Sequence, residues 1–158
     1  MGELVLNTLR EEFSDLPDAA QLVRVIVRLL LAVMLGAVLG YERERHESAA
    51  GLRTHMLVAL GAALFVVAPQ AAGFEPQDVS RVLQGLIAGI GFLGAGAIIK
   101  LSEREQVKGL TTAASIWATA AIAAAAGLGR AWTAIIATLF AFVILGVLLR
   151  VEARMINR

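Results

Sequence analysis

The residues of this sequence best suited to chemistry lie in and beside two short charged stretches, at the ends of apolar segments. They are Glu42, Glu44, Arg53, Thr54, His55, Thr111 and Thr112, with Lys100 and Lys108 close by. If the apolar segments are helices, four helix ends bring these groups together, and the free N–H groups at two helix starts add positive potential. The set could form a polar vestibule or a docking surface, in which His55 would be the group able to titrate near neutral pH. It could also serve only to anchor and cap the helices, with Thr111 or Thr112 as an N-cap.

Enzymatic chemistry and metal binding find little support in the sequence. Cysteine is absent, and no nucleophile has a base beside it. Mg²⁺ prefers carboxylate oxygens and water as ligands, yet no carboxylate lies within residues 57–73, 81–100 or 110–149. We therefore expect a protein that is not an enzyme, with no metal site and no cofactor.

The composition is typical of an integral membrane protein. Of 158 residues, 58% are hydrophobic and only 17% are charged, and the charges fill the gaps between apolar runs. A soluble domain is nearer half apolar and a quarter charged. The lipid bilayer is therefore an expected partner. The absence of a basic stripe argues against a nucleic acid partner.

Five apolar runs are long enough to cross a bilayer, at about residues 22–40, 54–73, 81–100, 110–128 and 131–149. The predicted fold is all-α, a polytopic membrane bundle with five transmembrane helices over residues 21–150. Residues 1–20 are expected to be amphipathic or disordered, and they lack the pattern of a cleaved signal peptide. Residues 151–158 would form a short cytoplasmic tail. The alanine-rich fourth run is expected in the bundle core, and the fifth is expected to face lipid.

The run at 81–100 carries five glycines, and it is predicted to be the central helix with a neighbour pressed against each face. At 100° per residue, Gly85, Gly89 and Gly96 fall within about 40° of one another, and Gly91 and Gly94 lie on the far side. Helix association in lipid depends on such small residues, because they allow close backbone approach. We expect a homo-oligomer, with a homodimer as the first hypothesis.

The same glycines allow two other interpretations. Gly89, Gly91, Gly94 and Gly96 spell G-x-G-x-x-G-x-G. A dinucleotide site of that pattern needs a preceding strand and a soluble βαβ unit, which the surrounding sequence does not predict. Alternatively, the glycines could let the helix break and free carbonyl groups for an ion, as in some transporters.

Arg28 lies inside the first apolar run. It falls within about 80° of Ala32 and Gly36 on a helix, a face of small residues that should pack on protein. Gly36 and Gly40 are accordingly predicted packing positions. The arginine could snorkel to the interface, or it could pair with a carboxylate across the packed face. In the second case Asp78 or Glu75 is the predicted partner of Arg28 or of Arg24.

Positive charges predict the orientation of the chain. Residues 41–53, residues 100–109 and the tail from 150 carry three Lys or Arg each, whereas the other two loops carry only Arg81 and Arg130. By the positive-inside rule the first three segments are cytoplasmic, which puts the amino terminus outside and the carboxyl terminus inside. Arg10, Arg24 and Arg28 favour the reverse orientation.

Four motifs resemble the MgtC/SapB family of bacterial inner-membrane proteins. They are GYERE at 40–44, GLRTHMLVALGAALF at 51–65, GIGFLGAGAI at 89–98 and GLTTAASIW at 109–117, and the resemblance covers about residues 25–128. It implies a multi-pass protein of the bacterial inner membrane. Many members of this family carry a cytoplasmic C-terminal domain of ACT-like fold. Because the sequence ends at Arg158, we expect that domain to be lacking.

The resemblance also implies a function. It links the chain to adaptation to low magnesium and, in pathogens, to a virulence function, survival inside macrophages; some members are thought to restrain the F-type ATP synthase. We therefore expect a non-enzymatic regulator of ion or energy homeostasis that acts through contact with another membrane protein. The alternative is a small oligomeric transporter or channel for cations, with residues 81–100 at the conducting interface.

Overall fold

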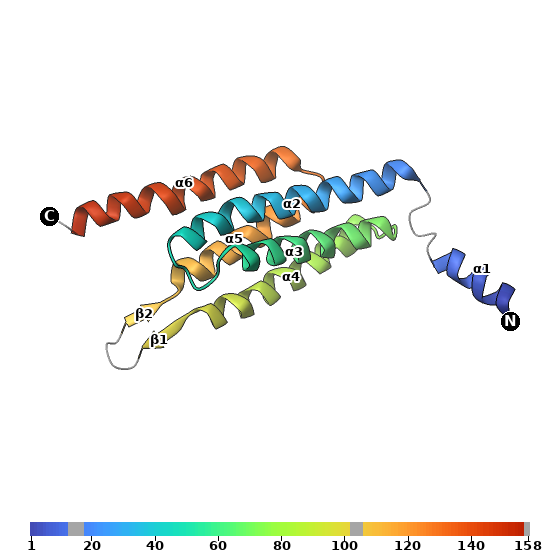
Figure 1. Cartoon of the computed structure of the whole chain (residues 1–158), viewed down its shortest axis with the longest axis horizontal. Coiled ribbons are helices and arrows are strands. Elements are labelled where there is room, and N and C mark those ends of the chain that lie inside the picture. Colours follow the sequence, from blue (N-terminus) through green and yellow to red (C-terminus); the bar gives the residue numbers. More distant parts are fainter. Residues whose placement is uncertain (13–17, 102–105, 157–158) are drawn as a thin grey trace.

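The computed structural model describes residues 1–12, 18–101 and 106–156, with side chains described outside 99–107 and 147–156 (Figure 1). In this part of the chain the elements are α1 (Gly2–Glu12), α2 (Ala19–Arg45), α3 (Leu52–Ala71), α4 (Pro76–Ala97), β1 (Ile99–Leu101), β2 (Gln106–Lys108), α5 (Leu110–Gly127) and α6 (Ala131–Ile156). The fold is a helix bundle with one short antiparallel hairpin, in which Lys100 pairs with Val107. The hairpin replaces the plain loop expected at 100–109.

Local sequence explains where the helices begin. Asp18 caps α2, because its side chain accepts a hydrogen bond from the backbone N–H of Ala20 at 3.1 Å. Pro76 begins α4, where its missing N–H removes no helical bond. Gly109 precedes α5 with φ 93°, a left-handed conformation that favours glycine. The N-cap of α5 is therefore Gly109, and the expectation that Thr111 or Thr112 caps this helix is wrong.

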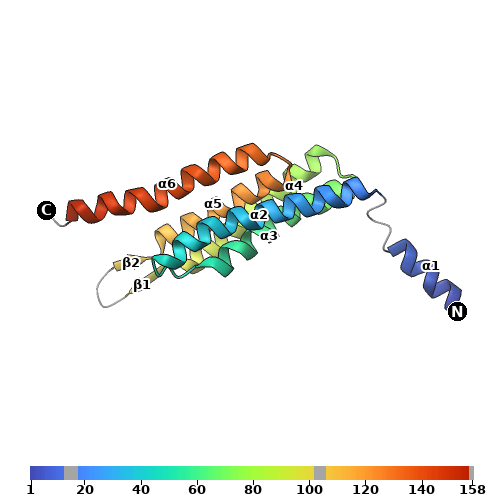
Figure 2. The ribbon, with the colours of Figure 1, turned by 45° about the horizontal axis from the view of Figure 1, so that its top comes forward.

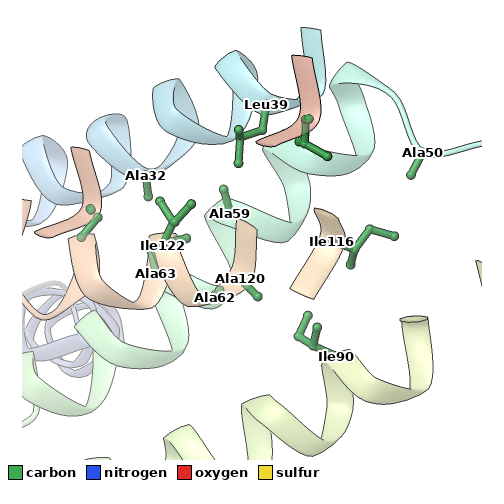
Figure 3. Close-up of a cluster of buried hydrophobic side chains, with 14 residues drawn as sticks. Ala32, Leu39, Ala50, Ala59, Ala62, Ala63, Ile90, Ile116, Ala120 and Ile122 are labelled. Atoms are coloured by element: carbon green, nitrogen blue, oxygen red, sulfur yellow. The ribbon is translucent and has the colours of Figure 1, made fainter. Parts of the chain in front are cut away.

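α5 is the central helix of the bundle. It contacts α2, α3, α4 and α6, and its alanines form much of the buried core. In Figure 3, Ile122 of α5 lies close to Ala32 of α2 and to Ala59 and Ala63 of α3. Alanine side chains let the backbones of neighbouring helices approach closely, which is the main source of helix packing in lipid. The alanine-rich run thus occupies the core, as its composition predicts.

The glycine-rich helix α4 lies at an edge of the bundle (Figure 1). It contacts α5 and α3 on one side. Gly94 faces Ala113 of α5, 3.6 Å from the position that a Cβ would take, whereas such a Cβ at Gly85, Gly89, Gly91 or Gly96 would meet nothing within 4 Å. The prediction of a central glycine helix with a neighbour on each face is therefore wrong for the single chain. α4 is also one continuous helix from Pro76 to Ala97, so the helix break considered above does not occur.

Four helices of the described chain, α2, α3, α4 and α5, are long and apolar enough to cross a membrane. Within α6, the described stretch Ala131–Gly146 is apolar but shorter. It exposes large side chains, among them Trp132, Leu139 and Phe140, as expected for a helix that faces lipid. α1 forms a helix with no buried residues, and it lies beyond one end of the bundle (Figure 2).

The two ends of the bundle differ. The hairpin, the connection between α2 and α3, and the carboxyl end of α6 lie at one end, and the start of α2 lies at the other (Figures 1 and 2). We call the first the hairpin end and the second the α1 end. Most of the candidate site residues lie at the hairpin end.

Candidate functional site

Close packing of α2 on α3 positions the site. A Cβ on Gly36 would lie 2.7 Å from the Cβ of Ala59 and 2.8 Å from the carbonyl oxygen of His55. A Cβ on Gly40 would lie 2.8 Å from the Cα of Leu52. Only glycine fits at such distances, so these two residues bring the start of α3 directly against α2. The first turn of α3, which carries His55, is thereby held inside the bundle.

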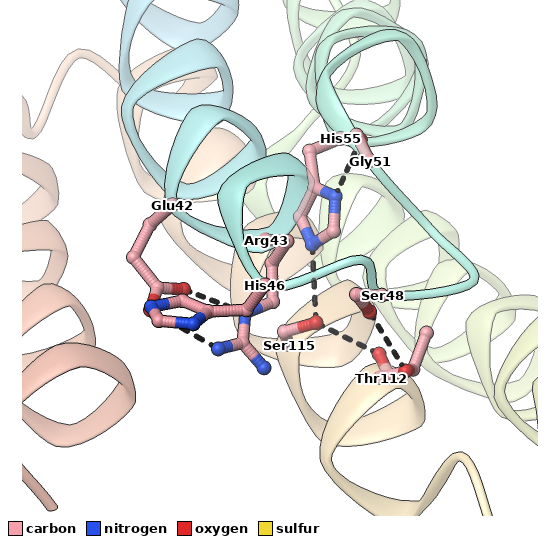
Figure 4. Close-up of polar contacts among 8 residues, drawn as sticks. All are labelled: Glu42, Arg43, His46, Ser48, Gly51, His55, Thr112 and Ser115. Atoms are coloured by element: carbon pink, nitrogen blue, oxygen red, sulfur yellow. Dashed lines mark hydrogen bonds and ion pairs between the residues drawn. The ribbon is translucent and has the colours of Figure 1, made fainter. Parts of the chain in front are cut away.

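His55 lies at the centre of a buried hydrogen-bond network (Figure 4). Its side chain is 0% exposed. Nδ1 lies 2.9 Å from the carbonyl oxygen of Gly51, and Nε2 lies 3.1 Å from Oγ of Ser115 on α5. A carbonyl oxygen can only accept, so Nδ1 carries the hydrogen. His55 therefore links α3 to α5 from inside the bundle, and its side chain does not reach the surface.

Ser115 has two acceptors for its single hydroxyl hydrogen. Besides Nε2 of His55, its Oγ lies 2.8 Å from the carbonyl oxygen of Thr112, one turn earlier in α5. In the neutral imidazole with a hydrogen on Nδ1, Nε2 accepts the hydroxyl hydrogen of Ser115. If Nε2 instead carries a hydrogen, it donates to Oγ of Ser115, and the hydroxyl of Ser115 donates to the carbonyl oxygen of Thr112. The hydroxyl orientation of Ser115 thus follows the protonation of His55.

The network continues to the connection between α2 and α3. Oγ1 of Thr112 forms a 2.9 Å hydrogen bond with Oγ of Ser48. Three segments are therefore tied together by short polar side chains: the connection through Ser48, α3 through His55, and α5 through Thr112 and Ser115 (Figure 4). Buried polar groups that are satisfied in this way favour one arrangement of the helices.

A buried ion pair lies next to this network on α2. Nε of Arg43 lies 2.6 Å from Oε2 of Glu42, and the side chains are 4% exposed for Arg43 and 6% exposed for Glu42. A second bond joins Nη2 of Arg43 to Oε1 of Glu42 at 3.1 Å. His46, which is half exposed, lies 3.3 Å from the same carboxylate. Charges this deeply buried need a partner of opposite charge. Here Glu42 and Arg43 neutralise each other.

Glu44 has a structural role at the start of α3. Its Oε2 accepts a hydrogen bond of 2.8 Å from the backbone N–H of Leu52, which lies in the first turn of that helix. Gly51 lies against the same carboxylate, so that a Cβ at this position would clash with it. The helix start, which has no cap from its own N-cap residue, is capped by a side chain from α2.

The remaining predicted members of the site are exposed. Arg53, Thr54, Thr111 and Lys108 face outward around the buried network, together with Arg45 and Glu47. The structure thus separates the predicted cluster into a buried part and an exposed rim. Lys100 falls among the side chains that are not described.

Three residues of the site were missed in the sequence: the buried Ser115, the half-buried Ser48, and Arg43 of the buried ion pair. Ser115 lies four residues from Thr111 and three from Thr112, so helical periodicity could have placed it on the face of Thr112. Thr119 continues that face by one more turn. Its Oγ1 is buried, and it has no hydrogen-bond partner among the described residues.

Arg28 lies at the α1 end and is held there by polar groups. Its Nη1 donates to Oε1 of Gln70 on α3 at 2.8 Å and to the carbonyl oxygen of Gly127 on α5 at 3.1 Å. Asp78 instead lies 3.4 Å from Arg81 in an exposed pair. The prediction that Asp78 or Glu75 neutralises Arg28 is therefore wrong. An amide and the free carbonyl of a helix end supply the acceptors.

The comparison with known proteins covers most of the chain. The MgtC family profile matches residues 29–154. The chain is 49% identical over 124 residues to protein SrpB of Synechococcus elongatus, and the match covers 72% of this chain and 68% of SrpB. It is 41% identical over 133 residues to protein MgtC of Salmonella typhimurium, with 84% of this chain and 55% of that protein covered. No solved structure matches the chain.

A third relative has a functional name. YhiD of Escherichia coli K12, named as a candidate magnesium transporter, is 36% identical over 141 residues, with 84% of this chain and 64% of YhiD covered. The chain thus spans between about half and two thirds of the length of these three relatives.

Proposed function

The chain belongs to the MgtC family of multi-pass bacterial membrane proteins, and from this membership we propose a non-enzymatic regulator of ion or energy homeostasis. It acts in the inner membrane through contact with another membrane protein. A link to magnesium is supported by the name of YhiD. We further propose that α6 is a fifth span, with the amino terminus outside and the hairpin end in the cytoplasm, because the Lys and Arg residues gather there.

The observation that supports a regulator is the construction of the hairpin end. A fully buried histidine and a buried ion pair hold α2, α3 and α5 in one arrangement. Around them lies a rim of exposed charges of both signs, formed by Glu44, Arg45, Glu47, Arg53 and Lys108. A rigid base below an accessible charged rim suits the docking of a partner with complementary charge, because little order is lost on binding.

Substitution of Arg53 tests whether the exposed rim binds a partner. It is exposed, and no ion pair or hydrogen bond of its side chain exists among the described residues. Arg53→Ala should therefore leave insertion and stability unchanged but abolish the ability of the protein to restore growth of a deletion strain at limiting magnesium. Arg81→Ala, which removes an exposed arginine at the α1 end, is the control and should restore growth. Full growth with Arg53→Ala, at equal protein level, would refute the docking rim.

The partner can be sought directly. The family resemblance suggests the F-type ATP synthase. Photo-crosslinking from an unnatural amino acid at position 53 in native membranes, followed by quantitative identification, should capture one membrane protein. The same probe at position 81 should not capture it. Equal capture from both positions would contradict a specific contact at the hairpin end.

We also propose that the open face of α4 forms a homodimer. Gly85, Gly89 and Gly96 share one face, and no other part of the described chain covers it. A Gly89→Leu substitution adds a side chain where there is space in the single chain, so it should dissociate the dimer without unfolding the protein. Gly146→Leu in α6 is the matched control, because that position is also open. A dimer that survives Gly89→Leu would overturn this interface.

A second candidate function is a cation transporter. It is favoured by the hydroxyl groups of Thr112, Ser115 and Thr119, which follow one face of α5 into the bundle, and by the unsatisfied Oγ1 of Thr119. Such a line could carry an ion or a proton part of the way. Beyond Thr119 the same helix is buried through alanines, including Ala123 and Ala126. The polar line therefore ends inside the bundle, which is why we prefer the regulator.

A further inference from the structure

A polar cavity at the α1 end is separate from the site described above. It has a volume of about 280 Å³ and lies between the start of α2 and the end of α3. Its lining is formed by Gln21, Arg24, Val25, Arg28, Val67, Gln70 and Ala71. Two arginines and two glutamines thus face one space at the edge of an otherwise apolar bundle.

The arginines of this cavity have no carboxylate partner in the described chain. The ion pairs found there join Glu42 to Arg43 and His46, and Asp78 to Arg81. Asp18, the nearest acid along α2, accepts the backbone N–H of Ala20 as the helix cap. Two positive charges therefore share one cavity whose lining, within the described residues, includes no carboxylate, and a bound anion would neutralise them.

Arg28 is held in position before any ligand arrives. Its Nη1 is bound by Gln70 and by the carbonyl of Gly127, while Nη2 and Nε have no hydrogen-bond partner among the described residues. Because Oε1 of Gln70 accepts from Arg28, the amide group of Gln70 is left to donate. A guanidinium fixed in this way loses little freedom when it binds a ligand.

Arg24 adds a second, more exposed guanidinium. It lies one turn before Arg28 on α2, so both side chains leave the helix on the same side. Its Nε donates to the carbonyl oxygen of Ala20 at 3.2 Å, which leaves both Nη groups available. The cavity therefore presents N–H donors from two arginines and an amide, and a planar fork of this type matches the oxygens of a phosphate group.

The surroundings place this cavity beside lipid. Leu22, Val23, Ile26 and Val27 of the same helix turns are exposed and apolar. Val25 and Val67 line the cavity itself. We propose that this cavity binds a phosphate group, either that of a lipid headgroup or free inorganic phosphate, with Arg24 and Arg28 as its ligands and Gln70 as the residue that orients Arg28.

The test uses the purified full chain in detergent, with two probes. Phosphatidylglycerol binding is measured by native mass spectrometry, with diacylglycerol, which has the same chains but no phosphate, as the comparison. Inorganic phosphate binding is measured by calorimetry. We expect at least one phosphate probe to bind, and diacylglycerol not to bind. Binding of the lipid alone identifies a headgroup site, and binding of inorganic phosphate alone identifies a site for a soluble ion.

Variants assign the binding to the cavity. Arg24→Gln should weaken it about tenfold, since one charge-assisted hydrogen bond is lost, and it should not unfold the protein because Arg24 is exposed. Arg28→Lys keeps the charge but loses the fork, and it should weaken binding as well. Arg81→Gln, an equal change of charge at the same end, should bind as the wild type does. Failure of both phosphate probes to bind, or unchanged binding by Arg24→Gln, would overturn the proposal.

Discussion

His55 on α3 and Ser115 on α5 are joined by a 3.1 Å hydrogen bond, although 60 residues separate them in the sequence. This bond joins the two helices that contribute most residues to the main buried hydrophobic cluster. The histidine has no exposed surface, so the bond is made without competition from water. Its removal is expected to loosen both helices at once.

His55→Ala should lower the free energy of unfolding by roughly 3 kcal/mol, because it leaves a cavity and removes the hydrogen bonds of the imidazole to Gly51 and Ser115. Ser115→Ala alone should lower it by about 1 kcal/mol. The double variant should be less destabilised than the sum of the two, since each single change already breaks the shared bond. Denaturant titration in micelles measures all three. Strict additivity would contradict the hydrogen bond.

Glu42→Ala should be among the most damaging substitutions at the hairpin end. It leaves the buried guanidinium of Arg43 without its carboxylate, a loss of about 3–5 kcal/mol for buried pairs. Glu44→Ala is the matched control on the same turn. It removes only the hydrogen bond to the N–H of Leu52, for which about 1 kcal/mol is expected. Thermal unfolding of the two variants should rank them in that order, and the reverse order would show that the ion pair is not buried as described.

Gly36→Ala should separate α2 from α3. The added Cβ would meet the carbonyl oxygen of His55 at 2.8 Å and Ala59 at 2.7 Å, and overpacking of this kind costs about 1–3 kcal/mol. Gly61→Ala on α3 has open space around the added atom. It should be neutral or slightly stabilising, because alanine favours a helix by roughly 1 kcal/mol over glycine. If both variants have the same stability, the close approach at Gly36 is wrong.

Gln70→Leu should destabilise the α1 end, while Asp78→Asn should not. The first removes a hydrogen bond to the arginine, worth about 1.5–3 kcal/mol for a charged group. The second removes a 3.4 Å contact between exposed side chains, which is worth at most about 1 kcal/mol. Hydrogen exchange at the start of α2 reports the difference. Faster exchange with Asp78→Asn than with Gln70→Leu would restore the carboxylate as the partner of Arg28.

Much of the fold could be predicted from the sequence, because lipid imposes simple rules on length and composition. The alanines of 110–128 place α5 in the core, and the large side chains of α6 indicate a lipid-facing helix. The glycines of α4 wrongly suggested a central helix. A glycine permits the close approach of another helix, but the sequence does not show whether a helix packs against it. Among the described residues, Gly36, Gly40 and Gly127 lie in close contact with a neighbouring helix, whereas a Cβ at Gly85 or Gly89 would meet nothing within 4 Å.

The location of the candidate site could be predicted from the sequence, but the burial and the contacts of its side chains could not. The motif positions bring Glu42, His55 and Thr112 to one end of the bundle, as the helix ends require. Whether a side chain points inward depends on helix rotation, so the burial of His55 and Arg43 and the exposure of Arg53 could not be read from the charges. One of the two acceptors of Arg28, the carbonyl oxygen of Gly127, was missed because a carbonyl at a helix end has no signature in the sequence.

The proposal that this chain acts by contact, and not by transport, is tested most directly by magnesium flux. Purified protein is reconstituted into vesicles that contain a magnesium indicator, and an added ionophore confirms that the indicator responds. We predict that Mg²⁺ entry equals that of empty vesicles. Saturable entry that depends on the protein and falls in Thr119→Val would contradict the account and establish the polar face of α5 as a conducting path.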